Sequence, residues 1–297
     1  MKVHFLGTAS CFPTPVRNVS CTCLQLSDGQ IWMFDCGECT QVQVQKSKLK
    51  FGKISKIFIT HLHGDHLFGL PGLLCSLGNG LDPELASKKV VDIYGPQNIL
   101  KYLITCLELS HSIPIFHCNV HELLEDQPGA LDVQKAKALG VKPGPDFGKL
   151  KNGETINVPD GAEVKPEQVL GDPIKGRKII ILGDTCDTSE ISHFSQNADY
   201  VIHEATMEDS LKEKAIECGH STPTMAAEFA VKVQAKKLCL NHVSPRYKPM
   251  EETDDETTES AKILLLEAEA HLAKVGCQSI EVIVAEDFLE DTIEKKK

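Results

Sequence analysis

The chain carries the stretch Thr60-His61-Leu62-His63-Gly64-Asp65-His66 directly after an apolar segment, Lys56–Ile59. Three imidazoles and one carboxylate within six residues form a dense set of the ligands that zinc prefers. In an extended backbone His61 and His63 lie on one side, whereas Asp65 and His66 point to different sides, as two adjacent metal ions require. The alternative is a surface loop that is rich in histidine by chance, and the crowding of these residues against a buried strand argues against it.

Further candidate ligands lie far along the chain, most of them directly after an apolar segment. They are Asp184, His203, His220 and His242. Strand ends gather at one edge of an α/β sheet, where binding sites form. Taken singly, each of these histidines is more often a structural residue than a ligand. Together with the cluster at His61, they favour a metal site that is assembled from several strand ends.

Length and composition are those of a soluble globular protein. The chain has 297 residues, of which 41% are hydrophobic and 25% charged, enough apolar sequence to bury a core and to exclude a disordered chain or a disulfide miniprotein. Apolar runs such as Ile179–Leu182 are too short to span a bilayer, so we expect no membrane segment. The N-terminus lacks the apolar stretch of a signal peptide, and the 12 cysteines include only one CxxC pair, Cys36 and Cys39. We therefore expect reduced thiols and a cytoplasmic or nuclear location.

Charge is distributed unevenly along the chain. The net charge of −11 argues weakly against nucleic-acid binding. Lysines nevertheless gather in Lys46–Lys56 and again in Lys135–Lys151, and an acidic run occupies Glu251–Glu259. A partner rich in phosphate responds to such local patches rather than to the net charge. A solvated face is the simpler interpretation of any lysine run taken alone.

Periodicity predicts a layered α/β fold. β-branched or alternating segments are typical of strands, and we expect them at 3–6, 22–26, 31–34, 54–60, 178–182, 200–203, 237–240 and 279–285. Helical signals fall at 69–77, 97–110, 221–235 and 261–275. Two successive groups of strands and helices indicate one domain over residues 1–297. Residues 129–153, rich in Gly, Pro and Lys, are expected to form a projecting arm.

Several motifs together resemble one known family. The HxHxDH pattern at His61–His66 is the signature of the metallo-β-lactamase superfamily, whose fold is a four-layer αβ/βα sandwich. Other segments resemble its tRNase Z branch, the ElaC-type zinc phosphodiesterases, in their short form. These are 5–8 (FLGT), 13–18 (PTPVRN), 34–38 (FDCGE), 144–150 (GPDFGKL), 203–206 (HEAT), 219–222 (GHST) and 242–247 (HVSPRY). The resemblance covers nearly the whole chain, and the last three motifs are specific to this branch.

The resemblance implies a role for each matching residue. One zinc ion would take His61 and His63, a second would take Asp65, His66 and His242, and Asp184 would bridge both. His220, oriented by Glu204, would donate a proton to the leaving group. Substrate contacts would come from Arg17, Asn18, Arg246 and Tyr247, and from the arm through Lys142, Gly144, Lys149 and Lys151. Members act as homodimers, in which one subunit's arm serves the other's active site.

One family motif has no match in this chain. Members supply a further histidine to the first zinc from a segment between the HxHxDH loop and the arm. Here the chain runs from Val120 through Asp126–Gly129 straight into the arm, and its nearby histidines, His111, His117 and His121, lie outside any matching pattern. We therefore expect the first zinc site to be weakened and the second to fill first. His121, just before the gap, is a candidate substitute.

The predicted function is that of a zinc-dependent endonuclease that processes the 3′ end of precursor tRNA. It would hydrolyse the phosphodiester at the 3′ trailer and leave a 3′-hydroxyl, with Asp65 accepting the proton of the nucleophile. Two alternatives remain open from the residues alone. One is a metallo-hydrolase acting on a thioester, a lactam or a small phosphodiester, which would need neither the arm nor the lysines. The other is a catalytically impaired variant that binds tRNA or a partner subunit.

Overall fold

The computed structural model describes residues 1–77, 90–112, 133–139, 141, 144–151, 155–158, 163–169, 176–250 and 260–294. Two compact units are present. The larger comprises residues 1–122 and 179–294, and the smaller comprises residues 123–178 and 295–297. The arm expected at about residues 129–153 falls inside the smaller unit.

The first sheet of the larger unit has six strands in the order β12-β1-β2-β3-β4-β5. Its strands are β1 (Lys2–Gly7), β2 (Cys21–Gln25), β3 (Ile31–Phe34), β4 (Ile54–Phe58), β5 (Asp92–Tyr94) and β12 (Glu290–Thr292). β1 pairs antiparallel with both β12 and β2, and β2 pairs antiparallel with β3, whereas β3, β4 and β5 run parallel. Gly29, with φ 85°, allows the tight turn between β2 and β3.

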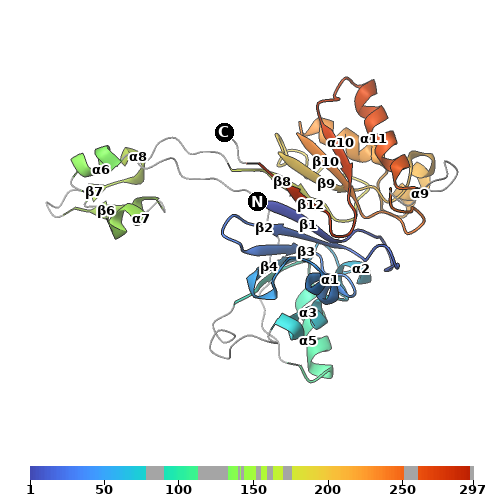
Figure 1. Cartoon of the computed structure of the whole chain (residues 1–297), viewed down its shortest axis with the longest axis horizontal. Helices are drawn as coiled ribbons and strands as arrows, with labels where there is room; N and C mark the ends of the chain where they lie inside the picture. The colour runs from blue at the N-terminus through green and yellow to red at the C-terminus, as the bar shows by residue number, and fades with distance from the viewer. Residues whose placement is uncertain are drawn as a thin grey trace. The chain divides into compact units, whose positions relative to one another are not determined.

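Helices cover one face of this sheet (Figure 1). They are α1 (Thr40–Lys46), α2 (Gly64–Leu67), α3 (Leu70–Leu77) and α5 (Ile99–Leu109), with the short 3-10 turn η1 (Phe51–Lys53) before β4. Buried side chains of β3, β4 and β5, such as Met33, Ile57 and Ile93, pack in one core with Leu73 of α3 and Leu103 of α5. Buried side chains of β3, β4 and β5 thus pack the helix-covered face of the sheet.

The second sheet has four parallel strands in the order β11-β10-β9-β8. They are β8 (Ile179–Ile181), β9 (Tyr200–Glu204), β10 (Lys237–Asn241) and β11 (Glu281–Val284). The helices of this half are η2 (Asp209–Leu211), α9 (Lys212–Glu217), α10 (Pro223–Lys232) and α11 (Lys262–Lys274). α10 begins with Pro223, which is favourable at the first helical position. Its buried face packs with α11 onto Val201, Leu238 and Leu240.

Polar contacts tie the two sheets together through β12. Tyr200 of β9 donates its hydroxyl to Asp291 of β12 at 2.8 Å. Lys237 of β10 forms an ion pair with the same carboxylate, also at 2.8 Å. The larger unit is therefore layered as helices, sheet, sheet and helices (Figure 1).

The smaller unit has its own small apolar core. The described elements are α6 (Val133–Ala138), α7 (Pro145–Lys151), β6 (Ile156–Asn157), β7 (Glu163–Val164) and α8 (Pro166–Val169). Ala136, Leu150, Ile156, Val164 and Val169 are buried against one another.

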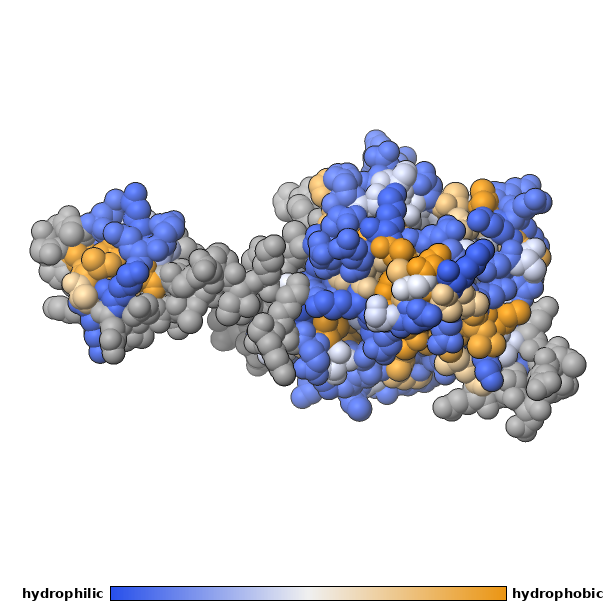
Figure 2. All heavy atoms as spheres, turned by 90° about the horizontal axis from the view of Figure 1, so that it is seen from above, coloured by the Kyte–Doolittle hydropathy of each residue, from blue (hydrophilic) through white to orange (hydrophobic). Residues whose placement is uncertain are grey.

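In the face shown in Figure 2, hydrophilic side chains dominate the surface, with apolar side chains gathered near the middle of the larger unit. None of the described helices is long and apolar enough to span a membrane.

Candidate metal centre

The candidate ligands meet at one edge of the larger unit, where parallel strands end. β4 leads into the loop with His61, β8 leads to Asp184, and β10 leads to His242. Glu204 is the last residue of β9. Carboxyl ends of parallel strands share an edge, so residues that are far apart in the sequence are brought within hydrogen-bonding distance.

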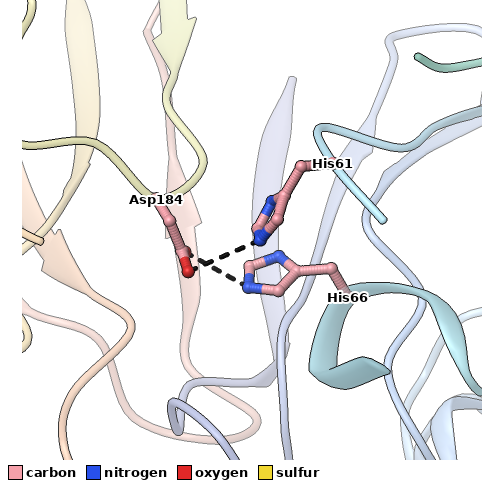
Figure 3. Close-up of side chains that lie close together, drawn as sticks. All are labelled: His61, His66 and Asp184. Atoms are coloured by element: carbon pink, nitrogen blue, oxygen red, sulfur yellow. Dashed lines mark ion pairs between the residues drawn. The ribbon is translucent and has the colours of Figure 1, made fainter. Parts of the chain in front are cut away.

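His61, His66 and Asp184 form one donor group, in which both imidazoles point toward the carboxylate (Figure 3). Nε2 of His61 lies 3.5 Å from Oδ2 of Asp184, and Nε2 of His66 lies 3.2 Å from its Oδ1. Nε2 of His61 is buried and makes no hydrogen bond within the part of the chain that the structure describes. Asp184 therefore has one oxygen facing each imidazole, as a residue that bridges two metal ions requires.

Asp65, His66 and His242 form a second donor group. Nε2 of His242 lies 3.1 Å from Nε2 of His66 and 3.3 Å from Oδ2 of Asp65. The same Asp65 oxygen accepts the backbone N–H of Cys11 at 2.8 Å, which holds the carboxylate in place. His66 and His242 are buried, so these donors are shielded from water.

The chemistry of this donor set fits a divalent cation. Nδ1 of His66 lies 2.7 Å from Asp35 Oδ2 and donates to it, and its Nε2 faces Nε2 of His242. Burial would lower the pKa of His66, but Asp35 and Asp184 raise it to about 11. Burial would likewise raise the pKa of Asp184, but His66 and His242 lower it to about 2. Positive charge is thus favoured between these donors, and a metal ion bound there would supply it.

His220 and Glu204 form a pair beside the donor groups. Nδ1 of His220 lies 3.1 Å from Oε1 of Glu204 and 3.8 Å from Oδ2 of Asp184. The hydrogen bond to Glu204 raises the pKa of His220 against the effect of burial. Glu204 is buried and also accepts the backbone N–H of Thr185 at 2.9 Å. His220 is thereby oriented through Nδ1, which leaves Nε2 available to a substrate.

Asp35 is a functional residue to which the sequence assigned no role. It follows β3 in the FDCGE motif and orients His66 by the hydrogen bond described above. Asp35 and His242 both adopt left-handed backbone angles, with φ 59° and φ 56°. Such angles are costly for residues other than glycine and gather at functional sites. The sequence did carry a signal for this role, because Asp35 is an aspartate directly after a strand and lies within the family motif FDCGE.

His63 and His203 lie outside the donor groups formed by the described residues. His63 is exposed, and its ring meets that of His61 edge-on with centroids 4.5 Å apart. Its assignment to the first zinc stays a prediction. His203 is buried, and its Nδ1 donates to the Glu204 carbonyl at 2.7 Å, so it serves the structure of β9.

The structure corrects three of the expected substrate contacts. Arg17 is 2% exposed and donates to Thr8 Oγ1 at 2.8 Å and to the Ala285 carbonyl at 2.7 Å. Asn18 is buried and bonds to the Glu38 carbonyl, and Tyr247 is 1% exposed with its hydroxyl accepting the N–H of Glu208. These side chains are buried, and the hydrogen bonds described above hold loops around the centre. Arg246 is exposed and stays a candidate for phosphate contact.

The expected arm contacts are only partly described. Gly144 has φ 147°, a conformation that side chains rarely adopt, and it precedes the first residue of α7. Lys149 is exposed and pairs with Asp146 at 3.3 Å. The backbone of Lys151 ends α7, whereas Lys142 lies outside the described residues, as do His117 and His121.

Comparisons with known proteins identify the fold and the family. Residues 1–103 match a family model described as anti-Pycsar protein Apyc1. The crystal structure of the metallo-β-lactamase fold protein YhfI from Bacillus subtilis covers 97% of the chain and 98% of its own with a TM-score of 0.61 at 16% identity. The crystal structure of the short form of human tRNase Z covers 99% of the chain and 100% of its own, with a TM-score of 0.64 at 34% identity. The larger unit thus has the metallo-β-lactamase fold, as the sequence predicted.

Curated relatives narrow this superfamily to one branch. Human zinc phosphodiesterase ELAC protein 1 is 39% identical, covering 100% of the chain and 99% of the relative. Ribonuclease Z of Microcystis aeruginosa is 42% identical, covering 84% of the chain and 86% of the relative. The chain belongs to this family, the tRNase Z or ribonuclease Z zinc phosphodiesterases.

The alignment with the human relative also reveals a difference in length. It extends over 370 positions with the human relative, although this chain has 297 residues. Because both proteins are covered almost end to end, the relative has about 70 internal positions without a counterpart here.

Proposed function

We propose that the chain is a zinc-dependent endonuclease that cleaves the 3′ trailer from precursor tRNA and leaves a 3′-hydroxyl. The observation that carries this proposal is the position of the His220–Glu204 pair beside the two donor groups, with Nδ1 of His220 3.8 Å from Oδ2 of Asp184. A hydrolase of phosphodiesters needs both a metal centre for the nucleophile and a proton donor for the leaving oxygen. The family membership favours this function over the two alternatives.

The chain's own residues would divide the reaction as follows. His61, His63 and Asp184 would hold one zinc, and Asp65, His66, His242 and Asp184 the other. A zinc ion bound there would lower the pKa of a water molecule and neutralise charge on the phosphate. Asp65 would take the proton of the nucleophile, and His220 would give one to the leaving 3′ oxygen. Exposed Arg246 would contact the RNA end.

Cleavage of a precursor tRNA with a 3′ trailer tests the proposal directly. We expect two products, with a 3′-hydroxyl on the tRNA fragment, and inhibition by a chelator that zinc reverses. Hydrolysis of a lactam, a thioester or a small phosphodiester without cleavage of the precursor would favour the first alternative. Binding of the precursor without any hydrolysis at saturating zinc would favour the impaired variant.

The family resemblance also supports a homodimer in which each arm serves the partner's centre. Sedimentation velocity of the purified protein would show a dimer if this is right and a monomer if it is wrong. A location in the cytoplasm or nucleus stays a prediction.

Zinc titration tests the weakened first site. With no matching family histidine, the first zinc would have His61, His63 and Asp184 as its protein ligands. Loss of even an indirect contact typically costs about 10–100-fold in metal affinity, so we expect the two sites to fill in sequence, the one with Asp65 first. The rate of precursor tRNA cleavage should rise only when the second equivalent of zinc is added. Two equally tight sites with full activity at stoichiometric zinc would contradict the weakening, and His121→Ala would then test the substitute ligand.

Arm lysines are expected to serve RNA binding rather than the chemistry. Replacing Lys142, Lys149 and Lys151 by Gln should weaken binding of precursor tRNA and reduce its salt dependence, because each lost phosphate contact removes about one unit of counterion release. Hydrolysis of bis(p-nitrophenyl) phosphate should change little. As a matched control, Lys232→Gln removes a lysine from the end of α10. Equal losses on both substrates would show that the arm is structural.

A further inference from the structure

Two threonines occupy equivalent positions in the two halves of the larger unit. Thr60 follows β4 and Thr206 follows β9. The Thr60 hydroxyl lies 3.1 Å from Nδ1 of His61 and 3.0 Å from each oxygen of Asp35. The Thr206 hydroxyl lies 3.0 Å from Nδ1 of His242 and 2.7 Å from Oε2 of Glu204. In each half, one hydroxyl therefore stands between a carboxylate and an imidazole of the donor groups.

Each carboxylate also contacts a second histidine directly. Asp35 accepts from Nδ1 of His66 at 2.7 Å, and Glu204 faces Nδ1 of His220 at 3.1 Å. The pattern is thus the same twice over: one carboxylate, one histidine bound to it directly and one histidine reached through threonine. Four of the imidazoles at the centre are held through Nδ1 in this way.

The direction of the hydrogen bonds follows from the groups involved. A hydroxyl has one proton, and an ionised carboxylate is its strongest acceptor. The Thr206 hydroxyl also lies 2.9 Å from the carbonyl of His242, but the contact to Glu204 is shorter and charge-assisted. With that proton donated to the carboxylate, the threonine oxygen is left to accept the Nδ1–H of the histidine. The Nε2 lone pair then faces the donor group.

We infer that Thr60 and Thr206 are positioning residues that fix the tautomers of His61 and His242, so that both present a bare Nε2 to metal. Thr206 also connects His242, a proposed ligand of the second zinc, with the proposed proton donor His220. The connection runs through Glu204, which contacts both Thr206 and His220. This inference rests on the proposed zinc chemistry.

Close packing supports the placement of Thr60. Gly183 precedes Asp184, and a Cβ atom built on it would lie 2.6 Å from Oγ1 and 2.7 Å from Cβ of Thr60. The backbone that delivers Asp184 can approach the threonine only because residue 183 has no side chain. Thr60 is therefore confined between Asp35, His61 and the end of β8, and Thr206 is 2% exposed.

Zinc affinity of hydroxyl-deleted variants tests the inference. Thr60→Val and Thr206→Val keep the shape of the side chain and remove its hydroxyl. We expect each to weaken one zinc site by about 10–100-fold, the site with His61 for Thr60→Val and the site with His242 for Thr206→Val. Competition with a chromophoric chelator gives both dissociation constants. Thr60→Ser and Thr206→Ser keep the hydroxyl and should restore affinity to within about 3-fold.

Thr222→Val is the matched control. Thr222 is as buried as Thr206, but its hydroxyl has no hydrogen-bond partner within the described residues and does not cap α10. This variant should keep both zinc affinities. If the serine variants bind zinc as weakly as the valine variants, or the valine variants bind it as tightly as the unaltered protein, the inference is wrong.

Imidazole nitrogen spectra of the unaltered protein give a second test that needs no variant to fold. Long-range ¹H–¹⁵N correlations should show protons on Nδ1 and bare Nε2 atoms in His61 and His242. A bare Nδ1 in either residue would overturn the assignment. Neither measurement uses RNA. If the protein has these tautomers and zinc affinities but fails to cleave precursor tRNA, the proposed function is refuted and the inference about the threonines stands.

Discussion

Asp65→Ala is expected to abolish cleavage of precursor tRNA while the protein stays folded. The carboxylate contacts His242 at 3.3 Å and lies 3.6 Å from Nε2 of His66, so its loss removes both a proposed metal ligand and the proposed base. Loss of a general base alone costs about 10²–10⁴-fold, and loss of the ligand adds to this. Single-turnover cleavage and zinc content per subunit are the measurements.

Folding of this variant should be preserved because Asp65 contributes no apolar contact to either core. The N–H of Cys11 loses its acceptor, but Cys11 is exposed and water can replace the carboxylate. The matched control is Asp187→Ala, which removes an exposed carboxylate bonded to Ser189 in the loop after Asp184. Cleavage by Asp65→Ala at nearly the unaltered rate would refute both roles of this residue.

His220→Ala is expected to slow the chemical step by about 10²–10⁴-fold without loss of zinc. The side chain is bonded to Glu204 and is assigned to protonation of the leaving oxygen. Binding of precursor tRNA, measured separately, should change little, so the loss appears in kcat. A substrate with a better leaving group, such as bis(p-nitrophenyl) phosphate, should be affected less, because its leaving oxygen needs no proton.

The structure contains a rival role for His220. Asp184, His220 and His242 also form a group of three potential ligands. If His220→Ala loses a zinc ion, His220 is a ligand and its assignment as proton donor is wrong. His193→Ala, which removes an exposed histidine whose ring is tilted against that of Phe194, is the control and should keep both the bound zinc and the cleavage rate.

Local sequence predicted most of the fold. Segments such as Ile31–Phe34 and Tyr200–Glu204 form strands because their aromatic and β-branched side chains suit a packed sheet. Helical periodicity likewise predicted α10 and α11. It gave no sign of α1, whose alternating Gln and Val residues carry no helical stripe, or of β12, which has three polar residues and pairs only along β1.

Candidate ligands were also visible in the sequence, because the HxHxDH stretch concentrates metal-binding groups within one loop. The tertiary structure decided which distant residues join them. Asp184 and His242 reach His66 only because β8, β10 and β4 end at the same edge. It also decided that Arg17 is a buried structural residue and Arg246 an exposed one, although both lie in quoted motifs. The roles of Asp35, Thr60 and Thr206 depend on contacts of about 3 Å between separate strand ends, and spacing along a single chain does not encode such contacts.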